Sequence, residues 1–262
     1  MTDHHRPRKR FGQHFLRDFG VVQHIVTAID PREDDHLVEI GPGLGVLTEQ
    51  LLPLVQKLDA VELDRDLVPK LQATYLPLGN FAIHSADALQ FDFCALVTDT
   101  EPLRIVGNLP YNISTPLIFH LIDRIHCIKD MHFMLQKEVV DRLAASPNSS
   151  DYGKLSVMIQ YHCAVDSLFN VPPDAFSPPP KVDSSIVRLV PHPTPPVAVK
   201  DLAAFAKLVS SAFAQRRKTL RNNLKGWLTD QQWQAVGIDP QRRAETLSLE
   251  EFARLAQALE TG

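Results

Sequence analysis

The stretch "LVEIGPGLGVLTEQLL", residues 37–52, decides the fold of this chain. An apolar run typical of a buried strand leads into glycines at 41, 43 and 45, and an amphipathic helical pattern follows. A strand that turns through glycines into a helix brings a ligand close to backbone N–H groups at the helix N-terminus. We therefore predict a ligand site at Gly41.

The spacing of the glycines limits which class of ligand the turn can bind. A dinucleotide fingerprint, GxGxxG, needs glycine at position 46, where this chain has Val46, and the chain shows no hydride-site His or Tyr–Lys pair. The pattern E-x-G-x-G-x-G, which begins at Glu39, is typical of S-adenosyl-L-methionine (SAM) methyltransferases. The glycines there let the chain pass beside the methionine part of a ligand that has no phosphates.

Two carboxylates support this interpretation. Glu62 ends the second expected strand, 21 residues after Gly41, where an acidic side chain can accept from both ribose hydroxyls. Asp87 follows the third expected strand, where it can accept from the adenine amine. Taken alone, each residue is equally consistent with a cofactor ligand and with a solvated residue at a strand end. The order of the glycine-rich turn, Glu62 and Asp87 along the chain favours a cofactor site. We interpret Asp64 and Asp66 as exposed charges.

A fourth strand ends in "RIVGNLPYNIST", residues 104–115. The N6 amine of adenine is a poor nucleophile because its lone pair is delocalised into the ring. The side-chain oxygen of Asn108 and the main-chain carbonyl of Leu109 can hold the amine hydrogens and direct the lone pair at a methyl donor. Pro110 fixes the backbone, and Tyr111 offers a ring for a flipped base. An isolated "NLPY" is more often an ordinary turn, but its position after the fourth strand favours catalysis.

Strand-like and helical segments alternate from about residue 20 to 190, which predicts an α/β fold with a mostly parallel sheet and helices on both faces. We predict strands at 36–40, 57–63, 81–85, 103–107, 131–136, 154–162 and 184–190. Four prolines in 191–197 predict a linker. Residues 198–262 predict a small all-helical domain that opens with one long helix over 201–228, with Thr229, Gly237 and Ser248 as capping residues.

The charge of the chain is unevenly distributed. The net charge is −4, but residues 1–185 carry −8 and residues 186–262 carry +4. Basic residues cluster at 6–10, within a basic N-terminal segment 1–19, and at 215–226. On the expected helix Arg217, Lys218, Arg221 and Lys225 fall within a ~100° arc that contains no acidic residue. Such an arc is usually a solvated face, but here it favours a surface that binds RNA phosphates.

Other features limit the class of protein. The sequence has no apolar run long enough to span a membrane and no secretory signal, so we expect a cytoplasmic location. Its three cysteines, Cys94, Cys127 and Cys163, are odd in number and widely spaced, and we expect reduced core thiols. The eleven histidines show no metal-ligand spacing, so we expect no metal site.

Nine blocks in order along the chain resemble the bacterial small-subunit rRNA adenine N6,N6-dimethyltransferases, the KsgA family, from about residue 8 to the C-terminus. These blocks are "RKRFGQHFL", "VEIGPGLGVLT", "VELD", "SADAL", "VGNLPYNIS", "LQKEVVDRL", "YGKLSVMIQYH", "VPPDAFSPPPKVDSSIVRL" and "QRRKTLRNNL". The resemblance implies a class I SAM-dependent methyltransferase (Rossmann-like) domain over 20–190. It also implies dimethylation of two adjacent adenosines in the 3′-terminal hairpin loop of 16S rRNA, on a late precursor of the small ribosomal subunit. We expect a monomer.

The resemblance also implies roles for individual residues. His14 and Leu16 of "QHFL" resemble family positions that touch the cofactor, together with Gly41, Glu62, Asp87 and Asn108. Position 14 is often Asn in the family, so the sequence leaves open whether His14 acts through its imidazole or its main chain. Phe176 resembles the ring that covers the target base opposite Tyr111. From the sequence alone, however, Phe176 is equally consistent with an aromatic residue of the hydrophobic core.

Three alternatives remain open at this point. An Erm-type enzyme that acts on large-subunit RNA would have the same "NLPY" site, but the block at 213–224 disfavours it. A ribosome assembly factor whose catalysis is incidental is the second. The third, an NAD-dependent oxidoreductase, is disfavoured by Val46.

Overall fold

The computed structural model describes residues 14–97 and 101–260. The chain forms two compact units: the first takes in residues up to Val140 and Asp166–Pro191, and the second takes in Asp141–Val165 and the residues from His192 onward. The sequence predicts that residues 141–165 belong to the larger domain, whereas in the structure they group with the C-terminal helices. Residues 192–201, which follow and overlap the proline-rich stretch, form neither helix nor strand.

A seven-stranded sheet is the centre of the first unit. Its strands are β2 (His36–Ile40), β3 (Lys57–Glu62), β4 (Phe81–Ser85), β5 (Leu103–Asn108), β6 (Ile128–Gln136), β7 (Cys163–Val171) and β9 (Ser184–Pro191). They lie in the order β4-β3-β2-β5-β6-β9-β7. The first five in this order run parallel, and β9 is antiparallel to β6. Two short strands, β1 (Phe15–Leu16) and β8 (Phe176–Ser177), form a separate antiparallel pair.

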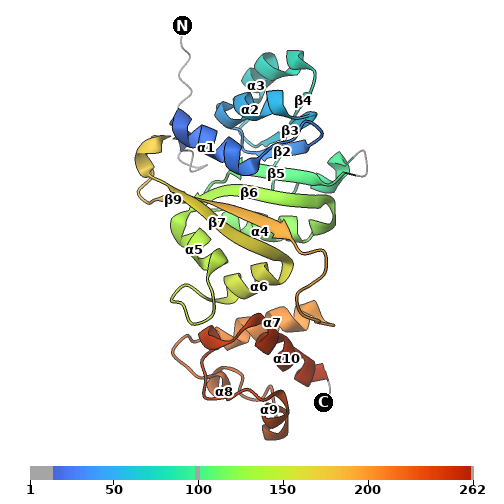
Figure 1. The fold of residues 1–262 in the computed structure, drawn as a ribbon, viewed down its shortest axis with the longest axis vertical. Coiled ribbons are helices and arrows are strands. Elements are labelled where there is room, and N and C mark those ends of the chain that lie inside the picture. Colours follow the sequence, from blue (N-terminus) through green and yellow to red (C-terminus); the bar gives the residue numbers. More distant parts are fainter. Residues whose placement is uncertain (1–13, 98–100, 261–262) are drawn as a thin grey trace. The chain divides into compact units, whose positions relative to one another are not determined.

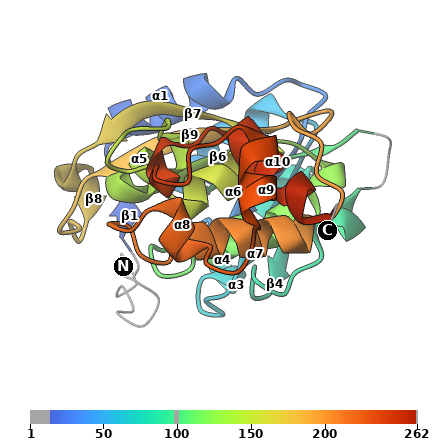
Figure 2. The same cartoon turned by 90° about the horizontal axis from the view of Figure 1, so that it is seen from below.

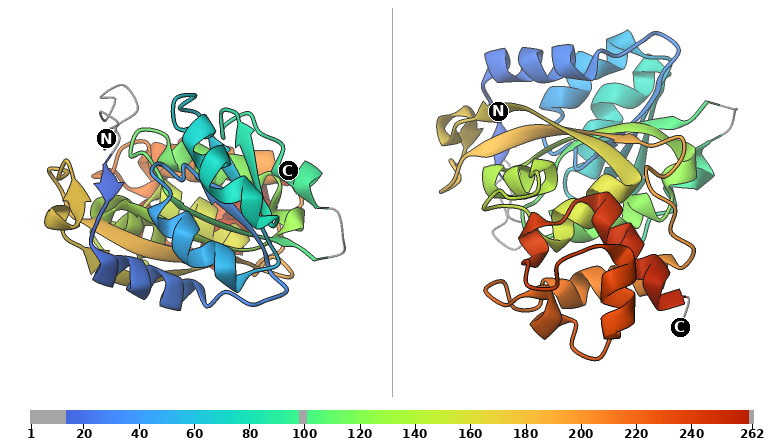
Figure 3. Two further views of the ribbon diagram at one scale, coloured as in Figure 1. Left: turned by 90° about the horizontal axis from the view of Figure 1, so that it is seen from above. Right: turned by 60° about the horizontal axis from the view of Figure 1, so that its bottom comes forward.

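Helices cover both faces of this sheet, as Figures 1 and 3 show. They are α1 (Phe19–Ile29), α2 (Val46–Leu51), α3 (Val68–Tyr75) and α4 (Ser114–Ile122), with α5 (Lys137–Ala144) following β6. The helices α1, α2 and α3 lie on one face and α4 lies on the other. Asp18 begins α1 because its side chain accepts from the N–H of Val21 at 3.0 Å. The predicted α/β class with a mostly parallel sheet is confirmed.

The strand register places the predicted site at one edge of the sheet. Ile40 pairs with Val61, and Glu62 pairs with Ser85, so β2, β3 and β4 end side by side. Glu39 pairs with Val106, which brings the end of β5 to the same edge. The glycine-rich turn, Glu62, Asp87 and the turn after β5 therefore all lie at the carboxyl ends of parallel strands, where ligands bind in open α/β sheets.

The second unit is mostly helical within its described residues, which also include the first three residues of β7. Its helices are α6 (Lys154–His162), α7 (Leu202–Ala212), α8 (Leu220–Asn223), α9 (Asp230–Val236) and α10 (Leu249–Glu260), and α10 packs against both α7 and α9 (Figure 2). The three predicted caps are confirmed. Thr229 and Gln232 form a capping box at α9, Gly237 ends that helix in a left-handed conformation, and the Ser248 hydroxyl accepts from the N–H of Glu251 at α10.

Two predictions of secondary structure are wrong. Residues 154–162 are the helix α6, not a strand: Leu155, Val157 and Ile159 are buried together with their neighbours, so the apolar run has no helical period to detect. The long helix expected over 201–228 ends at Ala212 and resumes only as the short α8. Arg217 and Lys218 lie in the turn between them, so the helical arc predicted for the four basic residues does not form.

The prediction of three reduced cysteines is also wrong, since Cys94 and Cys127 form a disulfide. The two residues are 33 apart in the sequence, and only the fold brings their segments together. Cys163 is free and buried. Within the described part of the chain, no helix has the length and apolar character needed to cross a bilayer.

Candidate active site

The glycine-rich turn is fixed at both of its ends. The N–H of Gly41 donates to the carbonyl of Val61 at 2.9 Å, which joins the turn to β3. At the other end Gly45 precedes α2 with φ of +82°, in the left-handed region that favours glycine. The hydroxyl of Tyr75 donates to the carbonyl of Gly45 at 3.1 Å and holds this end against α3. The turn is therefore a rigid element beside the ends of β2 and β3.

Glu62 lies at the end of β3, with its carboxylate held by backbone donors. Its Oε2 accepts from the N–H of Gly43 at 3.2 Å, and its Oε1 accepts from the N–H of Asp64 at 2.8 Å. The residue is only 6% exposed, and burial raises the pKa of its carboxyl. Because a carboxylate offers about four acceptor positions, Glu62 keeps acceptor capacity for hydroxyls of a ligand beside the turn.

Asp87 lies in the turn that follows β4. The N–H of Ala86 donates to the carbonyl of Glu62 at 3.1 Å, so this turn is tied directly to the end of β3. One carboxylate oxygen of Asp87 accepts from the N–H of Leu89 at 3.0 Å, which fixes the side chain. Asp87 is half-buried and lines the pocket, and since no described residue donates to its second oxygen, that oxygen can accept from a donor in the pocket.

The turn after β5 holds Asn108 in one orientation. The side-chain Nδ2 of Asn108 donates one of its two hydrogens to the main-chain oxygen of His14 at 3.1 Å, which fixes the orientation of the amide and leaves Oδ1 as its acceptor. The N–H of Leu109 donates to the carbonyl of Met134 at 3.2 Å, which anchors the turn to β6. The carbonyl of Pro110 accepts from the N–H of Ile113 at 3.1 Å. The carbonyl of Leu109 has no such donor among the described residues.

Tyr111 and His14 face each other at this site. Their rings stack with centroids 6.0 Å apart and planes inclined by 25°. The Tyr111 hydroxyl and the Ser184 hydroxyl lie 2.8 Å apart and share a hydrogen bond, and Nδ1 of His14 lies 2.8 Å from the carbonyl oxygen of Pro178. Burial raises the pKa of the Tyr111 phenol, so the ring is neutral and its face is apolar.

One pocket of about 190 Å³ in the first unit brings most of the predicted site residues together. The predicted residues that it brings together are His14, Leu16, Gly41, Glu62, Asp87, Asn108, Leu109 and Tyr111. They come from five separate segments of the chain, and most of the remaining lining is apolar. A concave, largely apolar pocket with a few convergent polar groups is the ordinary form of a small-molecule site.

Phe176 is the predicted site residue that the structure does not bring to the pocket. It pairs with Leu16 across β1 and β8, is 5% exposed, and packs in the hydrophobic core with Val22 and Ile186. The core interpretation, which the sequence left open, therefore describes this structure. The role of Phe176 as a cover for the target base is not supported here.

Several pocket residues are not predicted from the sequence. Phe133 and Met134 on β6 line the pocket beside Asn108, to which Met134 is paired across the sheet. Asp64 was predicted to be exposed, but it lines the pocket and is 1% exposed. Glu39 also lines the pocket. It is 2% exposed, accepts from the Thr48 hydroxyl at 2.5 Å, and burial raises its pKa to about 7.

The predicted basic residues lie in the second unit, and all four are exposed. Arg217 and Lys218 are in the turn after α7, Arg221 is on α8, and Lys225 follows α8. Arg221 forms an ion pair with Asp230 at 2.7 Å, whereas the described residues provide no such partner for the other three. These four residues are the basic cluster of the second unit. The basic stretch at 6–10 lies outside the described residues.

The strand order, with the antiparallel β9 between β6 and β7, and the ligand pocket at the ends of the parallel strands are those of the class I SAM-dependent methyltransferases. Among these enzymes, the chain belongs to the Ribosomal RNA adenine dimethylase family, which matches residues 4–261. This membership confirms the resemblance and the class of enzyme predicted from the sequence.

Individual relatives agree with the family. The chain is 59% identical to "Ribosomal RNA small subunit methyltransferase A" of Chromohalobacter salexigens, over 96% of this chain and 91% of that protein. It is 57% identical to the protein of the same name from Pseudomonas syringae, over 97% and 95% of the two chains. A solved dimethyladenosine transferase from Plasmodium falciparum superposes with a TM-score of 0.81 at 26% identity, covering 95% of this chain and 98% of that one. The 23S rRNA methyltransferase ErmE shares the fold, with a TM-score of 0.73 at 24% identity over 94% and 99%.

Proposed function

We propose that this chain transfers methyl groups from SAM to N6 of two adjacent adenosines in the 3′-terminal hairpin loop of 16S rRNA. The product is N6,N6-dimethyladenosine, formed on a precursor of the small ribosomal subunit in the cytoplasm. The observation that carries the proposal is the orientation of Asn108, which presents an acceptor in the same pocket as Glu62 and Asp87. The names of the relatives, which are small-subunit rRNA methyltransferases, support the choice of RNA.

The pocket fits SAM as its cofactor. The Glu62 carboxylate is already held toward the pocket by the N–H groups of Gly43 and Asp64, so it can accept from the ribose hydroxyls without reorganisation. Asp87 can accept from the adenine amine, and Gly41 leaves room beside the turn for the methionine part. His14 and Leu16 line the same pocket. When bound, SAM supplies an electrophilic methyl group. The residues of the chain bind the cofactor and orient the target amine.

Orientation of the target amine is the task of the turn after β5. The Oδ1 of Asn108 and the carbonyl of Leu109 can accept the two hydrogens of an adenine N6 amine. This withdraws the lone pair from the ring and directs it into the pocket. The bond from Asn108 to the carbonyl of His14 holds the amide in this orientation, because a rotation that exchanged Nδ2 and Oδ1 would break it. An amide cannot act as a base, so the proton of the product ammonium is lost to water.

Tyr111 is the residue that can stack on the target base. In this structure its ring faces the imidazole of His14. A base that stacks on Tyr111 through that face must take the place of the imidazole. Aromatic stacking is worth about 1–3 kcal/mol per base and does not depend on base identity, so selection of adenine rests on Asn108 and Leu109.

The second unit supplies the proposed surface for the RNA backbone. Its basic cluster is exposed, and Arg217, Lys218 and Lys225 carry charges that no described acidic group neutralises. We propose that residues 198–262 bind RNA through these residues and Arg221, and that the basic segment 1–19 adds to this affinity. Phosphate contacts provide affinity and position, while the pocket provides base selection.

Methylation of ribosomal particles tests the proposal. Purified protein and labelled SAM are incubated with unmodified 30S particles, and the modified nucleotides are mapped. We expect dimethylation of two adjacent adenosines in the 3′-terminal hairpin loop, and no transfer to 50S particles. Transfer to 50S particles alone would support an Erm-type enzyme, and dimethylation elsewhere in 16S rRNA would contradict the proposed target.

A further inference from the structure

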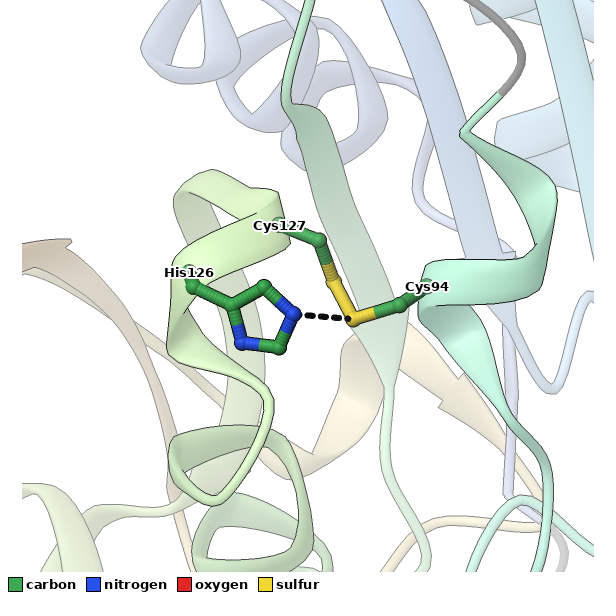
Figure 4. Close-up of side chains that lie close together, drawn as sticks. All are labelled: Cys94, His126 and Cys127. Carbon is green, nitrogen blue, oxygen red and sulfur yellow. Dashed lines mark hydrogen bonds between the residues drawn. A yellow bond between two sulfur atoms is a disulfide. The ribbon is translucent and has the colours of Figure 1, made fainter.

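A second reactive cluster lies away from the pocket and consists of Cys94, His126 and Cys127 (Figure 4). Cys94 is in a short 3₁₀ turn, Phe93–Leu96, that precedes β5, and the other two residues end the 3₁₀ turn Ile125–Cys127 immediately before β6. The pocket lies at the carboxyl ends of these parallel strands, whereas the cluster lies before their amino ends. It therefore belongs to no part of the methyl-transfer site.

The two sulfurs of the cluster differ in access. Cys127 is 7% exposed, whereas Cys94 is partly exposed. The exposed His126 places its Nε2 3.6 Å from the sulfur of Cys94. A small thiol or disulfide in solution therefore reaches Cys94 before Cys127, and Nε2 of His126, in the tautomer that protonates it, can donate to a Cys94 thiolate. A hydrogen-bond donor beside a thiolate stabilises it and makes the cysteine more reactive.

The surrounding backbone can also stabilise the reduced, dithiol form of Cys94 and Cys127. The carbonyl oxygen of Arg124 lies 3.1 Å from the Cys127 sulfur and 3.7 Å from the Cys94 sulfur, where it can accept from a thiol hydrogen. Each turn is also closed by its own backbone hydrogen bonds, from Cys127 to Arg124 at 3.1 Å and from Val97 to Cys94 at 3.2 Å. Loss of the disulfide therefore leaves both turns supported.

We propose that Cys94 and Cys127 are a reversible dithiol–disulfide pair that exchanges with low-molecular-weight disulfides through Cys94. In oxidation, the Cys94 thiolate attacks the small disulfide, forms a mixed disulfide, and expels one small thiolate. Cys127 loses its proton and attacks the Cys94 sulfur, which closes the intramolecular disulfide and expels the second small thiolate. Two protein thiols are oxidised, one small disulfide is reduced to two thiols, and the two protons go to the expelled thiolates. His126 donates a hydrogen bond to the attacking thiolate.

The same three ligand atoms lie within 4.8 Å of one another, which is also close enough for a thiophilic metal ion. Metal binding needs free thiolates, and the bonded sulfurs offer none. The observed bond thus favours exchange chemistry, and metal binding becomes an outcome of the test. Cys163, which is free, 1% exposed and has its pKa raised to about 12 by burial, is the matched control cysteine.

The test follows the oxidation of the reduced full-length protein by oxidised glutathione in the presence of EDTA. Samples are quenched over time and analysed by intact mass and peptide mapping. Wild type and Cys163→Ser should close the Cys94–Cys127 disulfide at equal rates, and reductant should reverse it. Cys127→Ser should accumulate one glutathione adduct at Cys94, at least about tenfold faster than Cys94→Ser acquires one at Cys127. His126→Gln should slow adduct formation at Cys94 by about three- to tenfold.

Other results overturn the proposal. Equal adduct rates in Cys94→Ser and Cys127→Ser would remove Cys94 as the attacking residue, and an unchanged rate in His126→Gln would remove the imidazole. A wild-type protein that stays a dithiol, or that retains stoichiometric zinc against EDTA and resists oxidation, would show a different kind of site. Isothermal titration with SAM verifies the fold of each variant, and it is valid as a control because the cluster lies outside the pocket.

Discussion

The side-chain amide of Asn108 donates a hydrogen bond to the main-chain oxygen of His14, 94 residues earlier in the chain, at 3.1 Å. An asparagine amide can present either its donor or its acceptor to a ligand. This bond uses one of the two N–H groups of Nδ2 and fixes the orientation of the amide, so Oδ1 is the acceptor that a ligand in the pocket can meet. The segment before β1 thereby determines how the turn after β5 meets an adenine amine, and His14 contributes through its main chain whatever its imidazole does.

Replacement of Asn108 by alanine should lower the rate of methyl transfer by at least ~100-fold, or ~2.7 kcal/mol. The interaction of Oδ1 with the amine matters most in the transition state, when the lone pair leaves the ring. Single-turnover rates at saturating SAM measure this effect apart from cofactor binding. Asn170→Ala is the control, because that asparagine is exposed on β7, and it should react as wild type. A near wild-type rate for Asn108→Ala would exclude the orientation mechanism.

Glu62→Ala should weaken SAM binding by about 1.5–3 kcal/mol, because the ribose hydroxyls lose a charged acceptor. Affinity for RNA should not change, since the carboxylate is buried in the pocket. Isothermal titration provides the measurement, and Glu49→Ala, an exposed glutamate on the neighbouring α2, provides the control. Unaltered SAM affinity in Glu62→Ala would remove Glu62 from the cofactor site.

The sequence predicted those parts of the site whose signals are local. Gly41, Glu62, Asp87 and Asn108 each follow a strand that the hydrophobic pattern identifies. Parallel strands end at a common edge, so these residues converge once the sheet is predicted. The helix α6 was missed for the opposite reason: it is buried almost all round, which removes the period that separates helix from strand.

The features that the sequence did not predict depend on contacts between distant segments. Phe176 is in the core because β8 pairs with β1, and two strands of two residues each leave no detectable pattern. Cys94 and Cys127 meet only because β5 and β6 are neighbours, and their spacing in the sequence resembles no disulfide motif. The burial of Asp64 likewise follows from the pocket walls and not from its flanking residues.

Gly45 should tolerate alanine less well than Gly79 does, although both have positive φ, +82° and +88°. A Cβ at Gly45 would lie 2.7 Å from the Tyr75 hydroxyl, whereas a Cβ at Gly79 meets nothing within 4 Å. Gly79→Ala should lower the free energy of unfolding by about 1–2 kcal/mol through backbone strain alone. Gly45→Ala should lower the free energy of unfolding by about 1–3 kcal/mol more than Gly79→Ala does, because Tyr75 must move. Urea titrations compare the two variants, and equal losses would show that the contact with Tyr75 is unimportant.

Alanine at Arg217, Lys218 and Arg221 together should weaken RNA binding and flatten its dependence on salt. The logarithmic slope should fall by about 0.7–0.9 for each phosphate that the variant no longer neutralises. Arg221 should contribute least, since Asp230 already pairs with it. Affinity for SAM should stay at the wild-type value. Arg32→Ala, an exposed arginine of the first unit, is the control. An unchanged slope in the triple variant would show that the basic cluster is an ordinary solvated surface.

Glu39 should make the stability of the protein depend on pH near neutrality. Burial raises the pKa of its carboxyl from 4.5 to about 7, so between these values the folded protein holds a proton that the unfolded chain has lost. The contribution of Glu39 to the free energy of unfolding is therefore fully present below about pH 4.5. It is lost as the pH rises to about 7, which lowers the free energy of unfolding by up to about 3 kcal/mol. Glutamine at position 39 is neutral at every pH and should remove this loss. Urea titrations at pH 5 and pH 8 should show Glu39→Gln gaining stability relative to wild type only at the higher pH, while the exposed Glu49→Gln follows wild type at both. Equal differences between Glu39→Gln and wild type at the two pH values would mean that Glu39 is ionised in the folded protein across this range.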